Sequence, residues 1–186
     1  MASAVHILGF SGSLRKGSLN TALLRVASQL LPPDVTLETF DLAPIPLYNG
    51  DVEAAGFPEA VVRFKQRIAA ADALLIATPE YNYSIPGVLK NAIDWASRPP
   101  KDSPLNGKPV SFMGAGGLLG SAGAQYHLHQ VCVFTNMLPV NRPEVFVMHA
   151  SEKFDPEGNL TDEMARQLIR ALLVSLADWT RHLRGG

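Results

Sequence analysis

The chain has 186 residues, of which 47% are hydrophobic and 18% are charged. This length predicts one folded domain with a sizeable core, and the composition excludes an intrinsically disordered or collagen-like chain. A net charge of -1 excludes a broad electrostatic attraction to nucleic acid or to an anionic membrane, and the single cysteine excludes an internal disulfide.

The first half of the chain predicts strands that alternate with helices. The run from Ala73 to Thr78 is continuously apolar, as expected of a strand that is covered on both faces. A long loop rich in proline and glycine separates the second strand from the second helix. The patterns predict strands at residues 5–10, 35–42 and 73–78, and helices at residues 19–31, from Pro58 onward, and at residues 85–96.

The second half continues the alternation. A fourth strand begins at Val110 and leads into a glycine-rich loop and a helix near residues 124–136, and a fifth strand follows at residues 145–148. The last helix is expected to start near Thr161 as its N-cap and to run to about Leu183.

Five strands and five helices, without a linker or an internal repeat, predict an α/β fold: one open five-stranded parallel sheet with helices on both faces. In such a sheet the ligand site lies beyond the carboxyl ends of the strands, where the strand order reverses. The loops after the first, third and fourth strands are therefore the candidate site.

The loop after the first strand has a composition suited to phosphate. Residues 11–21 place small hydroxyl residues, two cations and two glycines before a helix. Hydroxyl and backbone N–H groups at a helix N-terminus can surround a phosphate, and Arg15 can add a charge-assisted hydrogen bond. The glycine spacing fits neither the GxGxxG dinucleotide pattern nor the Walker A pattern. The alternative is a turn that is rich in serine and glycine only because turns are.

The loop after the third strand, Thr78–Gly87, holds two tyrosines between prolines. Its backbone amides and Asn82 could meet the polar edge of a flat heterocycle while an aromatic ring lies against the heterocycle's face. The alternative is an ordinary surface loop with solvated tyrosines.

Two segments resemble the two signatures of the NAD(P)H-dependent FMN reductase family, and in particular its chromate and quinone reductase branch. They are residues 12–20, GSLRKGSLN, and residues 79–95, PEYNYSIPGVLKNAIDW. The resemblance covers nearly the whole chain and implies a single flavodoxin-like, FMN-binding domain over residues 1–186, a three-layer sandwich. It also implies that NADPH or NADH reduces a tightly bound, non-covalent FMN, which then reduces a quinone, a free flavin, an azo compound or chromate.

The same resemblance implies which residues bind the cofactor. It implies no catalytic residue, because the flavin carries the chemistry, and it gives Glu80 a positioning role. No metal ligand is expected either, because the chain has no CxxC pair and His127 and His129, two residues apart, face different ways on a helix. The phosphate loop corresponds to Ser11, Ser13, Leu14, Arg15, Ser18, Leu19, Asn20 and Thr21; the flavin-ring loop to Pro79, Glu80, Tyr81, Asn82, Tyr83 and Ser84; and the backbone neighbours of the flavin to Ala115, Gly116 and Gly117.

One segment departs from the family pattern. Where the family often has Gly-Gly-x-Arg-Ala-Gln, residues 120–125 read GSAGAQ, with glycine at position 123. A contact that the family arginine makes is therefore not implied for this chain.

The expected partners are a nicotinamide donor, a small-molecule acceptor and further copies of the chain. No Asp, Glu, Lys or Arg occurs from Pro109 to Asn141, so part of this stretch is expected to be buried between the subunits of a homodimer or homotetramer. Its polar residues and glycines argue against a membrane helix. The start of the chain lacks the features of a signal peptide, and Cys132 suits a reducing compartment as a buried apolar residue, so we expect a cytoplasmic protein.

Two other functions remain open at this point. A flavodoxin-type electron carrier would share the fold and the cofactor, although a net charge of -1 offers no strongly one-signed docking surface. A nucleotide-binding sensor without turnover would hold no flavin. Rapid steady-state oxidation of NAD(P)H distinguishes the enzyme from the carrier.

Overall fold

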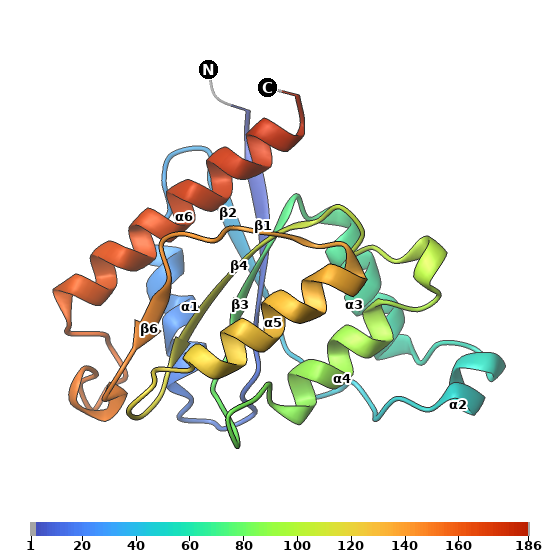
Figure 1. Cartoon of the computed structure of the whole chain (residues 1–186), viewed down its shortest axis with the longest axis horizontal. Coiled ribbons are helices and arrows are strands. Elements are labelled where there is room, and N and C mark those ends of the chain that lie inside the picture. The colour runs from blue at the N-terminus through green and yellow to red at the C-terminus, as the bar shows by residue number, and fades with distance from the viewer. Residues whose placement is uncertain (1–2, 186) are drawn as a thin grey trace.

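The structure is a computed structural model, which describes residues 3–185. Strands alternate with helices along the described chain (Figure 1). The strands are β1 (Val5–Ser11), β2 (Val35–Phe40), β3 (Ala73–Ala77), β4 (Pro109–Ala115), β5 (Leu138–Pro139) and β6 (Val145–Val147). The helices are α1 (Leu19–Gln29), α2 (Gly50–Ala55), α3 (Glu59–Ala70), α4 (Gly87–Ala96), α5 (Ala122–Thr135) and α6 (Glu163–Leu183).

The strands form one parallel sheet in the order β2-β1-β3-β4-β5, and β6 also pairs with β4. The chain moves outward from β1 to β2 and then returns to β3 on the other side of β1. The strand order therefore reverses between β1 and β3, which is where a parallel sheet of this kind binds its ligands. The predicted open parallel sheet is confirmed.

The last strand differs from the prediction. One strand was expected at residues 145–148, but two short strands pair with successive parts of β4, with Pro109 opposite Leu138 and Met113 opposite Val145. Pro139 and Pro143 explain the interruption, because proline has no N–H to donate to the neighbouring strand.

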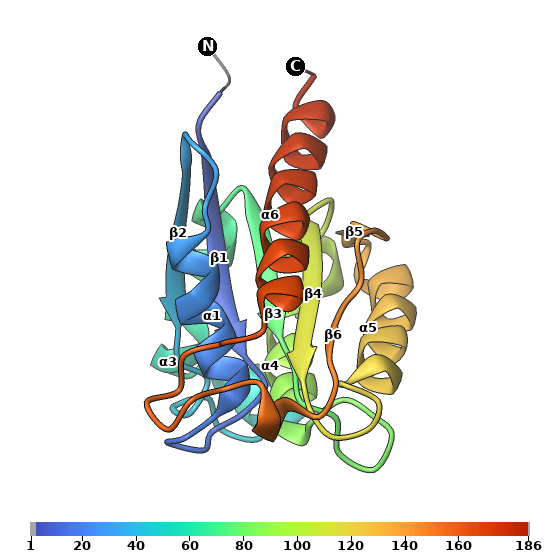
Figure 2. The ribbon, with the colours of Figure 1, turned by 90° about the vertical axis from the view of Figure 1, so that its left-hand side faces the viewer.

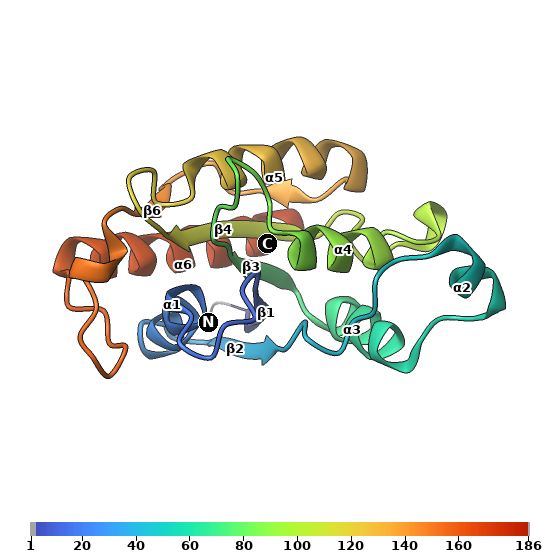
Figure 3. The same ribbon diagram turned by 90° about the horizontal axis from the view of Figure 1, so that it is seen from below.

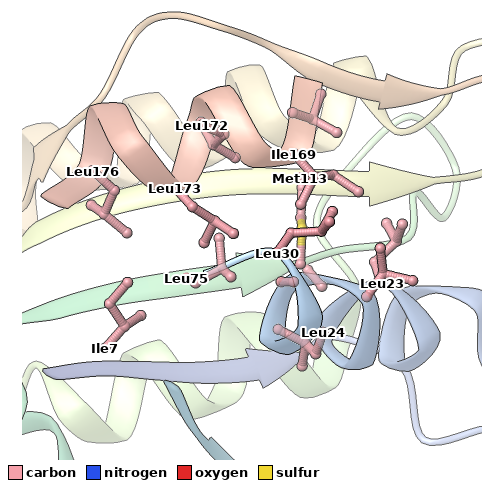
Figure 4. Close-up of a cluster of buried hydrophobic side chains, with 14 of the residues drawn as sticks. Ile7, Leu23, Leu24, Leu30, Leu75, Met113, Ile169, Leu172, Leu173 and Leu176 are labelled. Atoms are coloured by element: carbon pink, nitrogen blue, oxygen red, sulfur yellow. The ribbon is translucent and has the colours of Figure 1, made fainter. Parts of the chain in front are cut away.

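Helices cover both faces of the sheet (Figure 2). Alternate residues of β3 point to opposite faces: Leu75 packs with residues of α1 and α6, and Leu74 packs with residues of α3, α4 and α5. Figure 4 shows the first of these two clusters, in which Leu23 of α1 and Leu173 of α6 meet the sheet. Because both faces are covered, every residue of β3 is buried, as its apolar sequence predicts.

The start of α6 corrects one prediction. Its N-cap is Asp162, whose Oδ1 accepts a hydrogen bond from the backbone N–H of Ala165 at 2.7 Å. Thr161, the predicted cap, instead donates its hydroxyl to the carbonyl of Lys153. Asp and Thr are both good N-caps, so the sequence alone does not distinguish Thr161 from Asp162. The hydrogen bond from Thr161 to Lys153 leaves Asp162 as the cap.

The long loop between β2 and α3 contains the short helix α2, which the sequence did not predict and which buries no residue. The loop is fastened to α4, because Asn91 and Trp95 both donate side-chain hydrogen bonds to the carbonyl of Pro46. Trp95 is fully buried, so it belongs to the core. Within residues 3–185, no helix combines the length and the apolar character that a bilayer crossing requires.

Candidate functional site

Loops from four strands meet at the carboxyl edge of the sheet, which Figure 3 shows from below. They enclose a cavity of about 310 Å³, here called the central cavity. Eleven of the predicted site residues line it together with two that were not predicted. The lining residues are Ser13, Arg15, Ser18, Leu19, Asn20, Pro79, Glu80, Tyr81, Ala115, Gly116, Gly117, Ala150 and Ser151.

The loop after β1 forms one wall and leads into the N-terminus of α1. Ser18 caps this helix by accepting a hydrogen bond from the N–H of Thr21, and Ser11 accepts one from the N–H of Ser13. Arg15 is exposed and forms no ion pair within residues 3–185. An unpaired guanidinium beside a helix N-terminus can bind the terminal phosphate of a ligand in the cavity.

Asn20 ties this wall to the end of β4. Its side chain is buried, donates a hydrogen bond to the carbonyl of Ala115 at 3.0 Å and accepts one from the N–H of the same residue at 2.9 Å. One hydrogen of the amide remains for a ligand. Asn20 thus fixes the distance between two walls of the cavity as well as lining it.

The loop after β3 forms the opposite wall as a tight hairpin. The backbones of Tyr81 and Ser84 exchange two hydrogen bonds, and Asn82 and Tyr83 between them have φ values of 52° and 61°. Two successive left-handed residues are the geometry of a tight hairpin turn. Tyr81 therefore faces the central cavity, whereas Asn82, Tyr83 and Ser84 do not line it.

Helix α5 holds this hairpin from outside. Oε2 of Glu80 accepts a hydrogen bond from the N–H of Ala124, in the first turn of α5, at 3.1 Å, and Oγ of Ser84 lies 2.9 Å from Nδ1 of His127. In Figure 3 the loop after β3 reaches toward this helix. A carboxylate is favourable at the positive end of a helix, so Glu80 fastens the hairpin to α5.

Gly123 permits this contact. A Cβ atom at position 123 would lie 3.0 Å from Oε2 of Glu80 and 3.1 Å from the carbonyl oxygen of Tyr83. The position where the family often has arginine is thus closely covered by the hairpin in this chain.

The loop after β4 forms the third wall. A Cβ at Gly114 would lie 2.4 Å from the carbonyl oxygen of Thr78, so only glycine fits there without a shift of the backbone. Gly117 has open space around it, which leaves its backbone accessible to a flat ligand.

The fourth wall contains the two residues that were not predicted, Ala150 and Ser151. The N–H of Ala150 donates to the carbonyl of Gly116 at 2.9 Å, which brings the turn after β6 to the central cavity. The signal that could have found them is the direction of β6: it is parallel to its neighbours, so its following loop lies at the same edge.

Three predicted residues lie near the central cavity but line other hollows. Ser11 and Thr21 line a second cavity between α1 and β2, here called the side cavity. Leu14 lines an apolar recess beside the N-terminus of α4, together with Tyr81 and Val88. Successive residues of a helix point about 100° apart, which explains why Asn20 and Thr21 face different cavities.

Burial favours the neutral form of two titratable side chains of α5, Cys132 and His129. Burial raises the pKa of the Cys132 thiol to about 12, so it stays protonated and unreactive near neutral pH. Burial also lowers the pKa of His129. Within residues 3–185, no group of three His, Cys, Asp or Glu side chains is arranged to hold a metal ion.

Comparisons with known proteins identify the family of the chain. Residues 5–152 match the model of the family described as NADPH-dependent FMN reductase. The chain is 55% identical to an NAD(P)H-dependent FMN reductase of Pseudomonas aeruginosa over the full length of both proteins, and 43% identical to an NADPH:quinone oxidoreductase of Arabidopsis thaliana over 97% of this chain and 94% of that protein.

A solved structure is also similar. The flavoenzyme FerB of Paracoccus denitrificans, an NAD(P)H:acceptor oxidoreductase, superposes with a TM-score of 0.87 at 34% identity, over 96% of this chain and 98% of that one. The flavodoxin-like fold, the dependence on FMN and NAD(P)H, and oxidoreductase activity are therefore established for this chain. The chain belongs to the NADPH-dependent FMN reductase family.

Proposed function

We propose that the central cavity binds FMN between the loop after β1 and the loops after β3 and β4. The FMN phosphate lies at Ser13, Arg15 and the N-terminus of α1, and the flavin ring lies against Tyr81 and the backbone of Gly116–Gly117. The observation that carries this proposal is that a free guanidinium, a helix N-terminus and an aromatic hairpin line one cavity.

When bound, FMN supplies hydride transfer from NAD(P)H and onward reduction of an acceptor. The side chains of this site bind and orient. Arg15 holds the phosphate by a charge-assisted hydrogen bond, Asn20 fixes the spacing of two walls, and Glu80 fixes the hairpin on α5. The acceptors we propose are quinones first, because relatives are named for them, and then free flavins, azo compounds and chromate.

The functional unit we propose is a homodimer or homotetramer of one-domain subunits in the cytoplasm. The support is helix α5, which carries no Asp, Glu, Lys or Arg and exposes Val133 (85%) and Phe134 (73%). Such an apolar surface is favourable against a second copy of the chain and unfavourable in water. Light scattering that gives the mass of one chain with FMN bound would contradict the assembly.

The experiment that tests the function is an anaerobic spectral titration. The purified protein is expected to release FMN on heating and, in the loaded state, to lose its oxidised flavin absorbance with one equivalent of NADPH. One equivalent of benzoquinone then restores the absorbance, and both half-reactions are fast enough to account for steady-state turnover. Release of FAD, or a flavin that NADPH and NADH leave oxidised, would contradict the proposal.

A further inference from the structure

The side cavity is larger than the central cavity and adjoins it. It has a volume of about 430 Å³ and lies between α1 and β2, at the carboxyl end of the edge strand. Ser13 lines both cavities, so a ligand that crosses this residue can occupy the two at once.

The chemistry of the side cavity suits a nucleotide. Its apolar part includes Leu24 and Leu42, which are almost fully buried, and the half-buried ring of Phe40. Its polar part includes the cation Arg25 and the carboxylate Asp41. An apolar wall for a base, a carboxylate for ribose hydroxyls and a guanidinium for a phosphate are the groups that recognise a nucleoside phosphate.

Both charged groups have capacity for a ligand. The guanidinium of Arg25 makes one long contact, 3.5 Å to the carbonyl of Gly158, and forms no ion pair in the described part of the chain. Asp41 accepts a hydrogen bond from the N–H of Ala43 through Oδ1 at 2.9 Å, and Oδ2 has no hydrogen-bond partner within residues 3–185. A carboxylate directly after the second strand is also where dinucleotide-binding sheets hold a ribose hydroxyl.

We infer that the side cavity binds the adenosine-phosphate end of NAD(P)H. The adenine packs on the half-buried side chains of Leu37 and Phe40, Oδ2 of Asp41 accepts from a ribose hydroxyl, and Arg25 binds a phosphate of the adenosine half. The inference rests on the proposed function, because it requires the nicotinamide end to reach a flavin in the central cavity. The diphosphate of the donor then lies on the side-cavity side of Ser13, near Arg25, while the FMN phosphate stays on the central-cavity side, near Arg15.

The first test measures binding of nucleotide fragments that lack nicotinamide. Calorimetric titration of the FMN-loaded protein with adenosine 2′,5′-bisphosphate and with AMP is expected to show one site per chain. Arg25→Ala is expected to lower the affinity for the bisphosphate about 10-fold, because a hydrogen bond to a charged group is lost. If the affinity for AMP falls by the same factor in this variant, Arg25 contacts the 5′-phosphate. If the affinity for AMP is unchanged, Arg25 contacts the 2′-phosphate. Both results support the site.

Two further variants control this test. Arg63→Ala removes an exposed arginine of α3 that pairs with Glu59 and does not line the side cavity, and it is expected to leave fragment binding unchanged. Thr39 is an exposed residue of the edge strand β2, and Thr39→Trp, which places a large ring into the side cavity, is expected to abolish fragment binding while FMN stays bound. Absence of fragment binding in the parent protein, or displacement of FMN by the fragments, would overturn the inference.

The second test compares a whole donor with a truncated one. Arg25→Ala is expected to raise KM for NADPH about 10-fold with kcat unchanged, and to leave the kinetics with reduced nicotinamide mononucleotide unchanged, because that donor has no adenosine half. Equal losses with both donors would overturn the inference. A protein that binds no FMN or oxidises neither donor would instead contradict the proposed function, so the two failures are distinguishable.

Discussion

The loops after β1 and β3 form opposite walls of the central cavity, but they are held in different ways. The side-chain hydrogen bonds of the first loop join near neighbours in sequence, Ser11 with Ser13 and Ser18 with Thr21, and one backbone hydrogen bond, from Gly12 to Ala77, joins it to β3. The second is a strained left-handed hairpin that is fastened to α5, about 44 residues further along the chain. In the proposed binding mode, the FMN phosphate therefore lies at a wall held mostly by short-range hydrogen bonds, whereas the flavin ring lies at a wall that depends on contacts with a distant helix.

The largest expected effect is on the connection between the first wall and the end of β4. Asn20→Ala leaves the buried N–H and C=O of Ala115 without partners, and we expect it to destabilise the protein by about 2–4 kcal/mol in urea unfolding. Gln29→Ala, at the exposed end of the same helix, is the control and should change the free energy of unfolding by less than about 0.5 kcal/mol. Equal stabilities of Asn20→Ala and the parent would show that the connection contributes nothing.

The next effect isolates the locally built wall. Arg15→Ala is expected to weaken FMN binding about 10- to 100-fold and to leave the affinity for riboflavin unchanged, because riboflavin lacks the phosphate. Lys16→Ala removes the neighbouring exposed cation, which does not line the central cavity, and should lower the affinity for FMN by less than about threefold. Flavin fluorescence titrations measure all of these affinities. Equal losses for FMN and riboflavin would mean that Arg15 shapes the loop and does not contact the phosphate.

A smaller effect isolates the wall held by α5. Glu80→Ala removes the carboxylate from the N-terminus of α5 and is expected to weaken FMN and riboflavin alike, by about 3- to 10-fold, because such a contact contributes roughly 1 kcal/mol. Glu80→Gln keeps an oxygen that can accept from the N–H of Ala124, so its affinity for both flavins should fall by less than that of Glu80→Ala. A loss confined to FMN would contradict a positioning role at the ring.

The smallest effect concerns the exposed end of the hairpin. His127→Ala removes the hydrogen bond with Ser84. Because this hydrogen bond is exposed to water, the affinity for FMN should change by less than about threefold. Backbone amide exchange at residues 81–84 should nevertheless become faster, while His182→Ala on α6 leaves it unchanged. Unaltered exchange in His127→Ala would show that Glu80 alone holds the hairpin.

This difference between the walls also explains what could be predicted from the sequence. The strands and the order of the main helices follow from short-range patterns of apolar periodicity, and the hydroxyls beside a cation in residues 11–21 predict a phosphate loop that stays a prediction. The hold of α5 on Glu80, the role of Gly123 and the place of Ala150 and Ser151 depend on contacts between distant segments. The family resemblance implies that Ser11 and Thr21 belong to the phosphate loop, and in the structure both residues line the side cavity.

A crystal structure of the FMN complex would test the proposed binding mode. We expect the FMN phosphate within hydrogen-bonding distance of Ser13 and Arg15, with the flavin ring against Tyr81 and the backbone of Gly116–Gly117. A flavin found in the side cavity between α1 and β2, or a phosphate that Arg15 does not contact, would contradict it.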